Sequence, residues 1–143
     1  MSDAEYRPSP SSWVRTQVEA IVAAGDTRAV SIHGKPVVLL TMRGRRTAAI
    51  RKVPLIRVEH DGRYAAVGSR GGAPENPQWV ANLRANPDIE LQDGTSTYAV
   101  RARELAGTER EQWWDRCVGV FGDFAAYQVR TERVFPVFVL ESR

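Results

Sequence analysis

The stretch VVLLTMRGRRTAAIRKVPLIRVEH, residues 37–60, decides the fold. It opens with an apolar run that has the length and composition of a buried strand. The ten residues from Arg43 to Lys52 include six that are arginine, lysine or glycine, and none that is acidic. A second long strand is predicted over 50–60. Because proline donates no ladder hydrogen bond, Pro54 marks a sheet edge, a bulge or a bend in that strand.

Patterns on both sides of this stretch predict an α+β fold. Segments with strand character are 28–33, 63–68, 89–92, 96–106 and 134–141. Helical patterns cover 11–25, 76–86 and 107–129, and we expect Asn76 to cap the second helix and Thr108 the third. Together they predict an antiparallel sheet of about six or seven strands, curled into a barrel, with peripheral helices. We expect residues 1–10 to form a flexible N-terminal arm and residues 11–143 to form a single domain.

Positive charge is concentrated in one part of the chain. The net charge is only +3, yet the window from Thr27 to Val58 has no acidic residue. Its eight cations are Arg28, Lys35, Arg43, Arg45, Arg46, Arg51, Lys52 and Arg57. A basic segment on an otherwise acidic protein creates a directed field that attracts anions. The alternative is a solvated basic face with no partner.

Few side chains could perform catalysis unaided. Cys117, the single cysteine, falls in a predicted helix and is expected to be a small core residue. His33 and His60 are expected to be exposed turn residues rather than bases. These residues do not make up a zinc ligand set, so no metal is predicted. The chain also has neither a dinucleotide-binding glycine motif nor a P-loop, and an enzyme of this composition would need another cofactor to carry the chemistry.

The sequence predicts no membrane span, because no apolar stretch approaches the roughly 20 residues needed to cross a bilayer. A single cysteine fits a reducing compartment, so we expect a cytoplasmic protein. The helix at 11–25 could lie on a membrane surface, which would make the protein peripheral, although packing on the domain is favoured. The oligomeric state stays open.

Three stretches are suited to an anionic cofactor. In RGRRT, residues 43–47, a glycine permits a sharp turn and two guanidinium groups suit phosphate or carboxylate. In SRGGA, residues 69–73, paired glycines allow close approach of the backbone to a ligand. In NPQWVANL, residues 76–83, a helix N-terminus follows the glycine loop and Trp79 could stack on a flat ring or simply belong to the core.

In this order the stretches resemble the deazaflavin-dependent nitroreductase family, the split β-barrel reductases that use coenzyme F420. The matching segments are LLTMRGRRTAAIRKVPL, VGSRGGAPENPQWVANLRANPDIEL and FGDFAAYQVRTERVFPVFVLE, and the similarity runs from about Pro36 to Glu141. The resemblance implies a split barrel and a reduced 8-hydroxy-5-deazaflavin with a ribityl-phosphate arm and an oligoglutamate tail. Such a tail would account for the acid-free basic window.

The resemblance also implies roles for individual residues. The phosphate and tail would bind Arg45, Arg46 and Thr47, and Pro54 would lie near the ring. The loop lining the cofactor would comprise Ser69, Arg70, Gly71, Gly72 and Ala73. Trp79 and Asn82 would support that loop from the helix. The substrate pocket would be walled by Phe121, Phe124 and Tyr127, and since the family has tyrosines at these positions, only Tyr127 could still act there as proton donor.

The expected function is therefore transfer of a hydride from the reduced deazaflavin to a small electron-poor acceptor, such as an enone, an unsaturated lactone, a quinone or a nitroaromatic. Two alternatives stay open. One is a split-barrel reductase that uses FMN. The other is a barrel that binds nucleic acid, which is disfavoured because the cations are not interleaved with aromatic residues.

Overall fold

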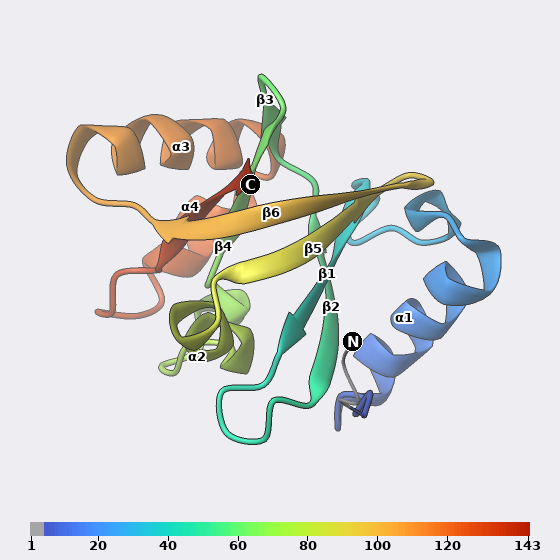
Figure 1. The fold of residues 1–143 in the computed structure, drawn as a ribbon. Coiled ribbons are helices and arrows are strands. Elements are labelled where there is room, and N and C mark those ends of the chain that lie inside the picture. Colours follow the sequence, from blue (N-terminus) through green and yellow to red (C-terminus); the bar gives the residue numbers. More distant parts are fainter. Residues whose placement is uncertain (1–4) are drawn as a thin grey trace.

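Seven antiparallel strands form one sheet in the computed structural model, which describes residues 5–143 (Figure 1). The order across the sheet is β2-β1-β5-β6-β7-β4-β3. The strands are β1 (Val37–Arg43), β2 (Ile50–Ile56), β3 (Glu59–His60), β4 (Arg63–Val67), β5 (Asp88–Asp93), β6 (Ser96–Glu104) and β7 (Val137–Ser142). The sheet curls but does not close, because β2 and β3 remain its two edges. The predicted antiparallel split barrel with peripheral helices is confirmed.

Helices cover the sheet from several sides (Figure 1). The α-helices are α1 (Ser12–Ala24), α2 (Gln78–Ala85), α3 (Gly107–Val120) and α4 (Asp123–Gln128). Two short 3-10 helices are η1 (Thr27–Ala29) and η2 (Arg70–Gly72). The predicted third helical segment is thus two helices, which break at Phe121.

Alternation along the strands separates an inner core from the outer packing layers. On β4, Tyr64 and Ala66 point into the barrel interior, where α2 contributes further apolar side chains. The neighbouring Ala65 and Val67 point to the outer face, which α3 and α4 cover. α1 covers a separate part of the sheet, over β1. Burying each large apolar side chain in these layers contributes about 1.5–3 kcal/mol, so the period of two fixes the strand register.

The edge strand β2 creates the opening in the barrel. Pro54 lies opposite Leu39 on β1, and among the described residues no strand pairs with the other side of β2, where only an isolated bridge joins Tyr6 to Ile50. Of the edge, the bulge and the bend that Pro54 left open, the structure shows the edge. The chain then passes through Arg57 and Val58 into β3 and β4, and Val58 accepts a hydrogen bond from the Ala65 N–H (2.9 Å). β2 and β4 therefore meet near Val58, and the two strands diverge from there.

The segment 28–33 is not the strand that the sequence predicted. The Asp26 carboxylate accepts a hydrogen bond from the Arg28 N–H (2.9 Å) and starts the 3-10 turn η1. Only a single bridge between Ile32 and Lys35 remains of the expected hairpin. A local side-chain bond has thus replaced the sheet ladder, as short acidic side chains often do.

The two predicted helix caps are also wrong. α2 starts after Pro77, and Asn76 does not cap it, because the side-chain oxygen of Asn76 accepts a hydrogen bond from Arg133 instead. α3 starts after Ala106, which places Thr108 inside the first turn. Neither helix has a side-chain cap.

The predicted flexible arm spans residues 1–10, of which 1–4 lie outside the described residues. From Glu5 onward the arm runs beside the start of β2. Ile50 donates its N–H to the Glu5 carbonyl and accepts from the Arg7 N–H, both at 2.9 Å. Arg51 also donates to the carbonyl oxygen of Arg7 (3.1 Å). These bonds connect the arm to the edge of the sheet.

Candidate active site

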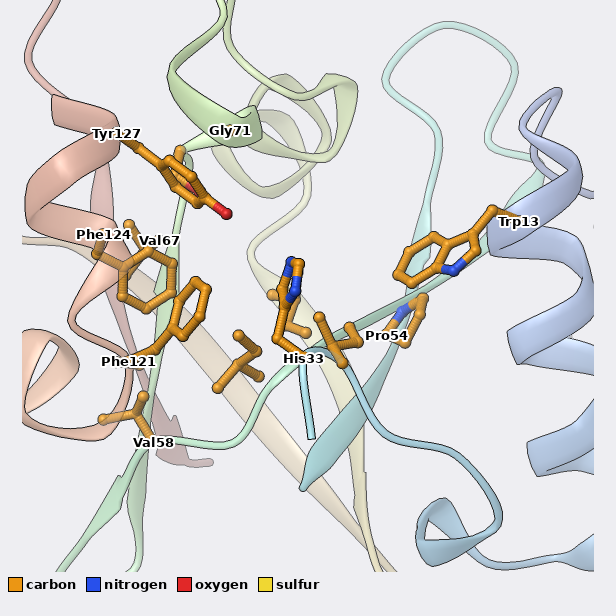
Figure 2. Close-up of a pocket in the computed structure, with 14 residues that line it drawn as sticks. Trp13, His33, Pro54, Val58, Val67, Gly71, Phe121, Phe124 and Tyr127 are labelled. Atoms are coloured by element: carbon orange, nitrogen blue, oxygen red, sulfur yellow. The ribbon is translucent and has the colours of Figure 1, made fainter. Parts of the chain in front are cut away.

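A cavity of about 280 Å³ lies where β2 and β4 diverge (Figure 2). Val58 lies at its base, Pro54 belongs to the β2 wall and Val67 to the β4 wall. The lining is largely apolar, and among the described residues no aspartate, glutamate, lysine or arginine belongs to it. Ligand-binding sites typically combine such apolar walls with a few polar groups.

Aromatic side chains form the wall beside α4. Phe121 meets Phe124 edge to face, with ring centroids 5.1 Å apart, and Phe121 meets Tyr127 at 5.9 Å. Both phenylalanines are 7% exposed, whereas Tyr127 is half-buried and directs its hydroxyl group into the cavity (Figure 2). The three residues of the predicted substrate pocket are therefore brought together, and edge-to-face contacts between aromatic rings stabilise their arrangement.

Two lining residues with aromatic rings, His33 and Trp13, were not identified as site residues from the sequence. His33 is an exposed turn residue, as expected, but its ring also lines the cavity and stacks on Phe121 with centroids 5.3 Å apart. Trp13 lines the opposite side from the start of α1 and is 52% exposed (Figure 2). One signal for Trp13 was available, because a large aromatic residue falls outside the apolar stripe that includes Val18 and Ile21.

The glycine loop closes the cavity above β4. Ser69 and Gly71 line it, and a Cβ atom at Gly71 would meet nothing within 4 Å, so this backbone is open to a ligand. Gly72 has a different reason to be glycine: a Cβ atom there would lie 2.6 Å from the carbonyl oxygen of Tyr127. The loop thus packs directly on the end of α4. Arg70 is exposed and pairs with Glu75 (3.6 Å), outside the cavity lining.

Arg133 holds the glycine loop in place. Its guanidinium group donates hydrogen bonds of 2.7–2.9 Å to four acceptors, which are the carbonyl oxygens of Gly68, Ser69 and Ala73 and the side-chain oxygen of Asn76. Burial lowers the pKa of Arg133, with a smaller contribution from the charge of Arg70. A five-donor fork can satisfy several carbonyl groups at once, which a lysine ammonium group cannot do in the same plane.

The basic turn between β1 and β2 is held by Asn82. The Asn82 side-chain oxygen accepts a hydrogen bond from the Arg45 N–H (3.0 Å). Asn82 therefore supports the basic turn rather than the glycine loop that the sequence had suggested. Arg45, Arg46 and Thr47 are exposed, and within residues 5–143 neither arginine side chain makes an ion pair or a hydrogen bond. Two guanidinium groups are thus available to an anion.

Trp79 does not line the cavity. It is 8% exposed, lies in the barrel interior and packs against Phe138 with ring centroids 6.1 Å apart. Of the two possibilities that the sequence left open for Trp79, the core position is confirmed and stacking on a ligand is not supported.

Other cations of the acid-free window are already engaged. Arg28 pairs with Asp26 (2.8 Å) and Arg57 pairs with Asp93 (2.9 Å). Lys52 donates a hydrogen bond to Thr41 (3.1 Å). Asp26 and Asp93, which lie outside the window, thus neutralise part of its positive charge. Arg45 and Arg46 of the basic turn have no such acidic partner among the described residues.

The described part of the chain offers no competing site for metal or thiol chemistry. Residues 5–143 hold no group of three or more metal-ligating side chains. Cys117 is fully buried, and burial raises the pKa of its thiol to about 12. No helix among these residues has the length and apolar character needed to cross a membrane.

Comparison with known proteins agrees with this architecture. The sequence profile of the F420H(2)-dependent quinone reductase family matches residues 13–142. A Mycobacterium tuberculosis relative, named provisionally as an F420H(2)-dependent quinone reductase, is 37% identical over 108 residues, which are 76% of this chain and 91% of the relative.

Two solved structures have the same fold at higher identity. One, described as a domain-swapped dimer, is 45% identical with a TM-score of 0.74 and covers 93% of this chain and 100% of its own. The other, an F420-H2 dependent reductase (FDR-A), is 44% identical with a TM-score of 0.71 and covers 78% and 99% of the two chains. The predicted resemblance to F420-dependent split-barrel reductases is confirmed. The chain belongs to the F420H(2)-dependent quinone reductase family.

Proposed function

We propose that this protein reduces quinones by hydride transfer from the reduced form of coenzyme F420. One observation carries the proposal. In a chain of this family, a cavity with apolar and aromatic walls lies beside a glycine loop whose backbone at Gly71 is not covered by other atoms. The flat apolar wall at Pro54 and the phenyl rings of Phe121 and Phe124 suit planar conjugated molecules.

The residues present fit the coenzyme at two places. At Gly71 no atom lies within 4 Å of where a Cβ would be, so a flat ring can approach the backbone closely. A side chain at this position would block that approach. At the basic turn, Arg45 and Arg46 are exposed and have no acidic partner among the described residues. Guanidinium forks bind phosphate and carboxylate well, so this turn would hold the phosphate and the glutamate tail.

When bound, the coenzyme supplies two electrons as a hydride. The cavity walls then have three tasks. The apolar side chains of β2 and β4 exclude water, Phe121 and Phe124 form an apolar wall that limits the positions open to the acceptor, and the hydroxyl group of Tyr127 donates a hydrogen bond to the acceptor oxygen. Orientation and water exclusion can each contribute several kcal/mol to lowering the barrier.

The same arrangement would accept other electron-poor conjugated molecules. Enones, unsaturated lactones and nitroaromatics share a planar π system with a polar oxygen, and nothing in the cavity lining excludes them by charge. Among these acceptors we propose quinones as the substrate, because the family is named for quinone reduction.

Anaerobic turnover tests the proposal. Purified protein is mixed with the reduced deazaflavin and a panel of quinones, enones and nitroaromatics, and the return of the oxidised coenzyme's visible absorbance is followed. We expect quinone-dependent oxidation at catalytic protein concentrations. Binding titrations with the deazaflavin and with FMN run in parallel. Tight binding of FMN with no binding of the deazaflavin would overturn the proposal.

A further inference from the structure

We propose that His33 is a catalytic residue of this site and that it gives a proton to the oxygen of the bound quinone. The inference rests on the proposed function and adds to it the source of the second hydrogen of the hydroquinone. It starts from the position of a turn residue that is remote in sequence from the aromatic wall and from the glycine loop (Figure 2).

A tight turn fixes the backbone of His33. Ile32 and Lys35 exchange two backbone hydrogen bonds, of 3.0 and 2.9 Å, across the turn. His33 has a φ of 50° and Gly34 a φ of 73°, so both lie in the left-handed region. Residues with a side chain seldom adopt this region, but histidine, like asparagine and aspartate, does so more often than most. The turn therefore holds the backbone of His33 in one defined conformation.

Stacking then fixes the ring. The imidazole lies nearly parallel to Phe121, with an angle of 13° between planes and 5.3 Å between centroids. One face of His33 is thus covered by a buried ring, and the cavity lies beside the imidazole (Figure 2). His60 differs, because it meets Trp113 edge to face and pairs with Asp61 at 3.2 Å. Within residues 5–143, His33 makes no hydrogen bond or ion pair of its own.

His33 is the lining side chain best suited to release a proton. The other lining side chains with a donor are Trp13, Ser69 and Tyr127. An indole N–H and the two hydroxyl groups can orient an oxygen, but imidazole exchanges protons far more readily at neutral pH. Among the described residues no carboxylate lines the cavity, so none of them accepts a hydrogen bond from the imidazole there.

The step balances in atoms and electrons. The quinone is reduced by the two electrons of the hydride, and the coenzyme is oxidised. As negative charge develops on a quinone oxygen, the N–H bond of protonated His33 breaks and an O–H bond forms, which gives the hydroquinone. The imidazole is exposed, so it regains a proton from water before the next turnover.

The first test removes and restores the imidazole. His33→Gly suits the left-handed backbone and leaves room beside Phe121. We expect kcat for a quinone to fall by about 100-fold, with KM little changed, and free imidazole to restore much of the rate. His60→Gln, which alters the other turn histidine, should keep the wild-type rate. A fall in rate that imidazole does not restore, at unchanged melting temperature, would show a purely structural role and would overturn the proposal.

The second test needs no turnover. In protein with ¹⁵N-labelled histidine, saturated with oxidised coenzyme, menadione is added and the imidazole resonances are followed by NMR. We expect the His33 resonances to shift and those of His60 to stay, with His60→Gln providing the assignment. If wild-type protein reduces quinones but His33→Gly is fully active and the His33 resonances do not move, the inference fails while the proposed function stands. If wild-type protein oxidises no reduced coenzyme with any quinone, the proposed function itself fails.

Discussion

The side-chain oxygen of Asn76 accepts a 2.7 Å hydrogen bond from the guanidinium group of Arg133, 57 residues away. The same group donates to the carbonyl oxygens of Ser69 (2.8 Å) and Ala73 (2.9 Å). Arg133 thus bonds to two parts of the chain at once. One is the loop that lines the cavity, and the other is Asn76, which lies just before α2. The loop side of the cavity is thus shaped by a residue that does not itself line the cavity.

We expect Arg133→Lys to loosen the glycine loop. Several charge-assisted hydrogen bonds are lost and buried carbonyl groups lose their donor, so the free energy of unfolding should fall by roughly 2–3 kcal/mol. Urea denaturation measures the change, and a deazaflavin titration should show weaker binding. Arg130→Lys is the matched control, because Arg130 is exposed and makes one long bond of 3.4 Å to Gly71. Equal effects of the two variants would contradict this account.

The basic turn should select for a polyanionic coenzyme. We expect Arg45→Ala combined with Arg46→Ala to weaken deazaflavin binding by about 10-fold or more and FMN binding far less, because only the deazaflavin carries a glutamate tail. The difference should shrink as salt rises, since the Debye length falls from about 10 Å at 0.1 M to 3 Å at 1 M.

A control for net charge separates the turn from the overall field. Arg28→Ala combined with Arg101→Ala also lowers the net charge by two, but at exposed arginines outside the turn, which pair with Asp26 and Asp88. These variants should leave deazaflavin binding nearly unchanged at 0.15 M salt, measured by fluorescence titration. A loss as large as that of the turn variants would mean that net charge, not the turn, attracts the coenzyme.

Cys117 should be unreactive in the folded protein. The thiol is fully buried and burial raises its pKa to about 12, so almost none of the reactive thiolate is present at pH 8. A disulfide reagent at pH 8 should therefore label almost no native protein within an hour and should label one thiol per chain at once in denaturant. Rapid native labelling would show that α3 opens frequently.

Local patterns in the sequence predicted the elements of the fold because those patterns have local causes. Apolar runs and strand-forming residues between turns indicated the strands, and Pro54 indicated an edge, a bulge or a bend in β2, of which the structure shows the edge. The segment 28–33 failed for a local reason as well, since the carboxylate of Asp26 drew the chain into a 3-10 turn. Propensity for a strand could not anticipate that competing bond.

The site was harder to predict because its parts are far apart in the chain. The glycine loop and the aromatic residues carry recognisable patterns, and the structure brings them together. His33 joins them through its stacking on Phe121, 88 residues further along the chain, and no short sequence motif indicates that contact. The sequence predicted a supporting role for Asn82 on the helix, but which loop it supports depends on how α2 packs. In the structure its partner is the N–H of Arg45 in the basic turn. Such contacts across 37 or more residues come from tertiary packing rather than from local propensity.

The hydrogen-bonded group of Asp93, Arg57 and Tyr64, near the end of β2, should make the free energy of unfolding depend on pH. Asp93 accepts hydrogen bonds from Arg57 (2.9 Å) and from the Tyr64 hydroxyl group (2.6 Å). Burial alone would raise the pKa of Asp93, but the bonds from Arg57 and Tyr64 outweigh it and lower the pKa. A carboxyl group with a lower pKa in the folded state stabilises the protein above its unfolded value, near 3.9, and this contribution is lost as pH falls through the folded value.

We therefore expect Asp93→Asn to lower the free energy of unfolding by about 1–3 kcal/mol at pH 7, because the amide leaves Arg57 without its charged partner. The gap between variant and wild type should begin to narrow below about pH 4, where the carboxyl group of the unfolded wild type takes up a proton, and it should close only as pH falls through the lower folded pKa. Asp88→Asn is the control on the same strand. Its pair with Arg101 is 3.3 Å long with both side chains more than half exposed, so it should cost at most about 1 kcal/mol. Urea denaturation from pH 3 to pH 7 measures all three proteins. A gap that stays constant over that range would mean that Asp93 acts through its shape and not through its charge.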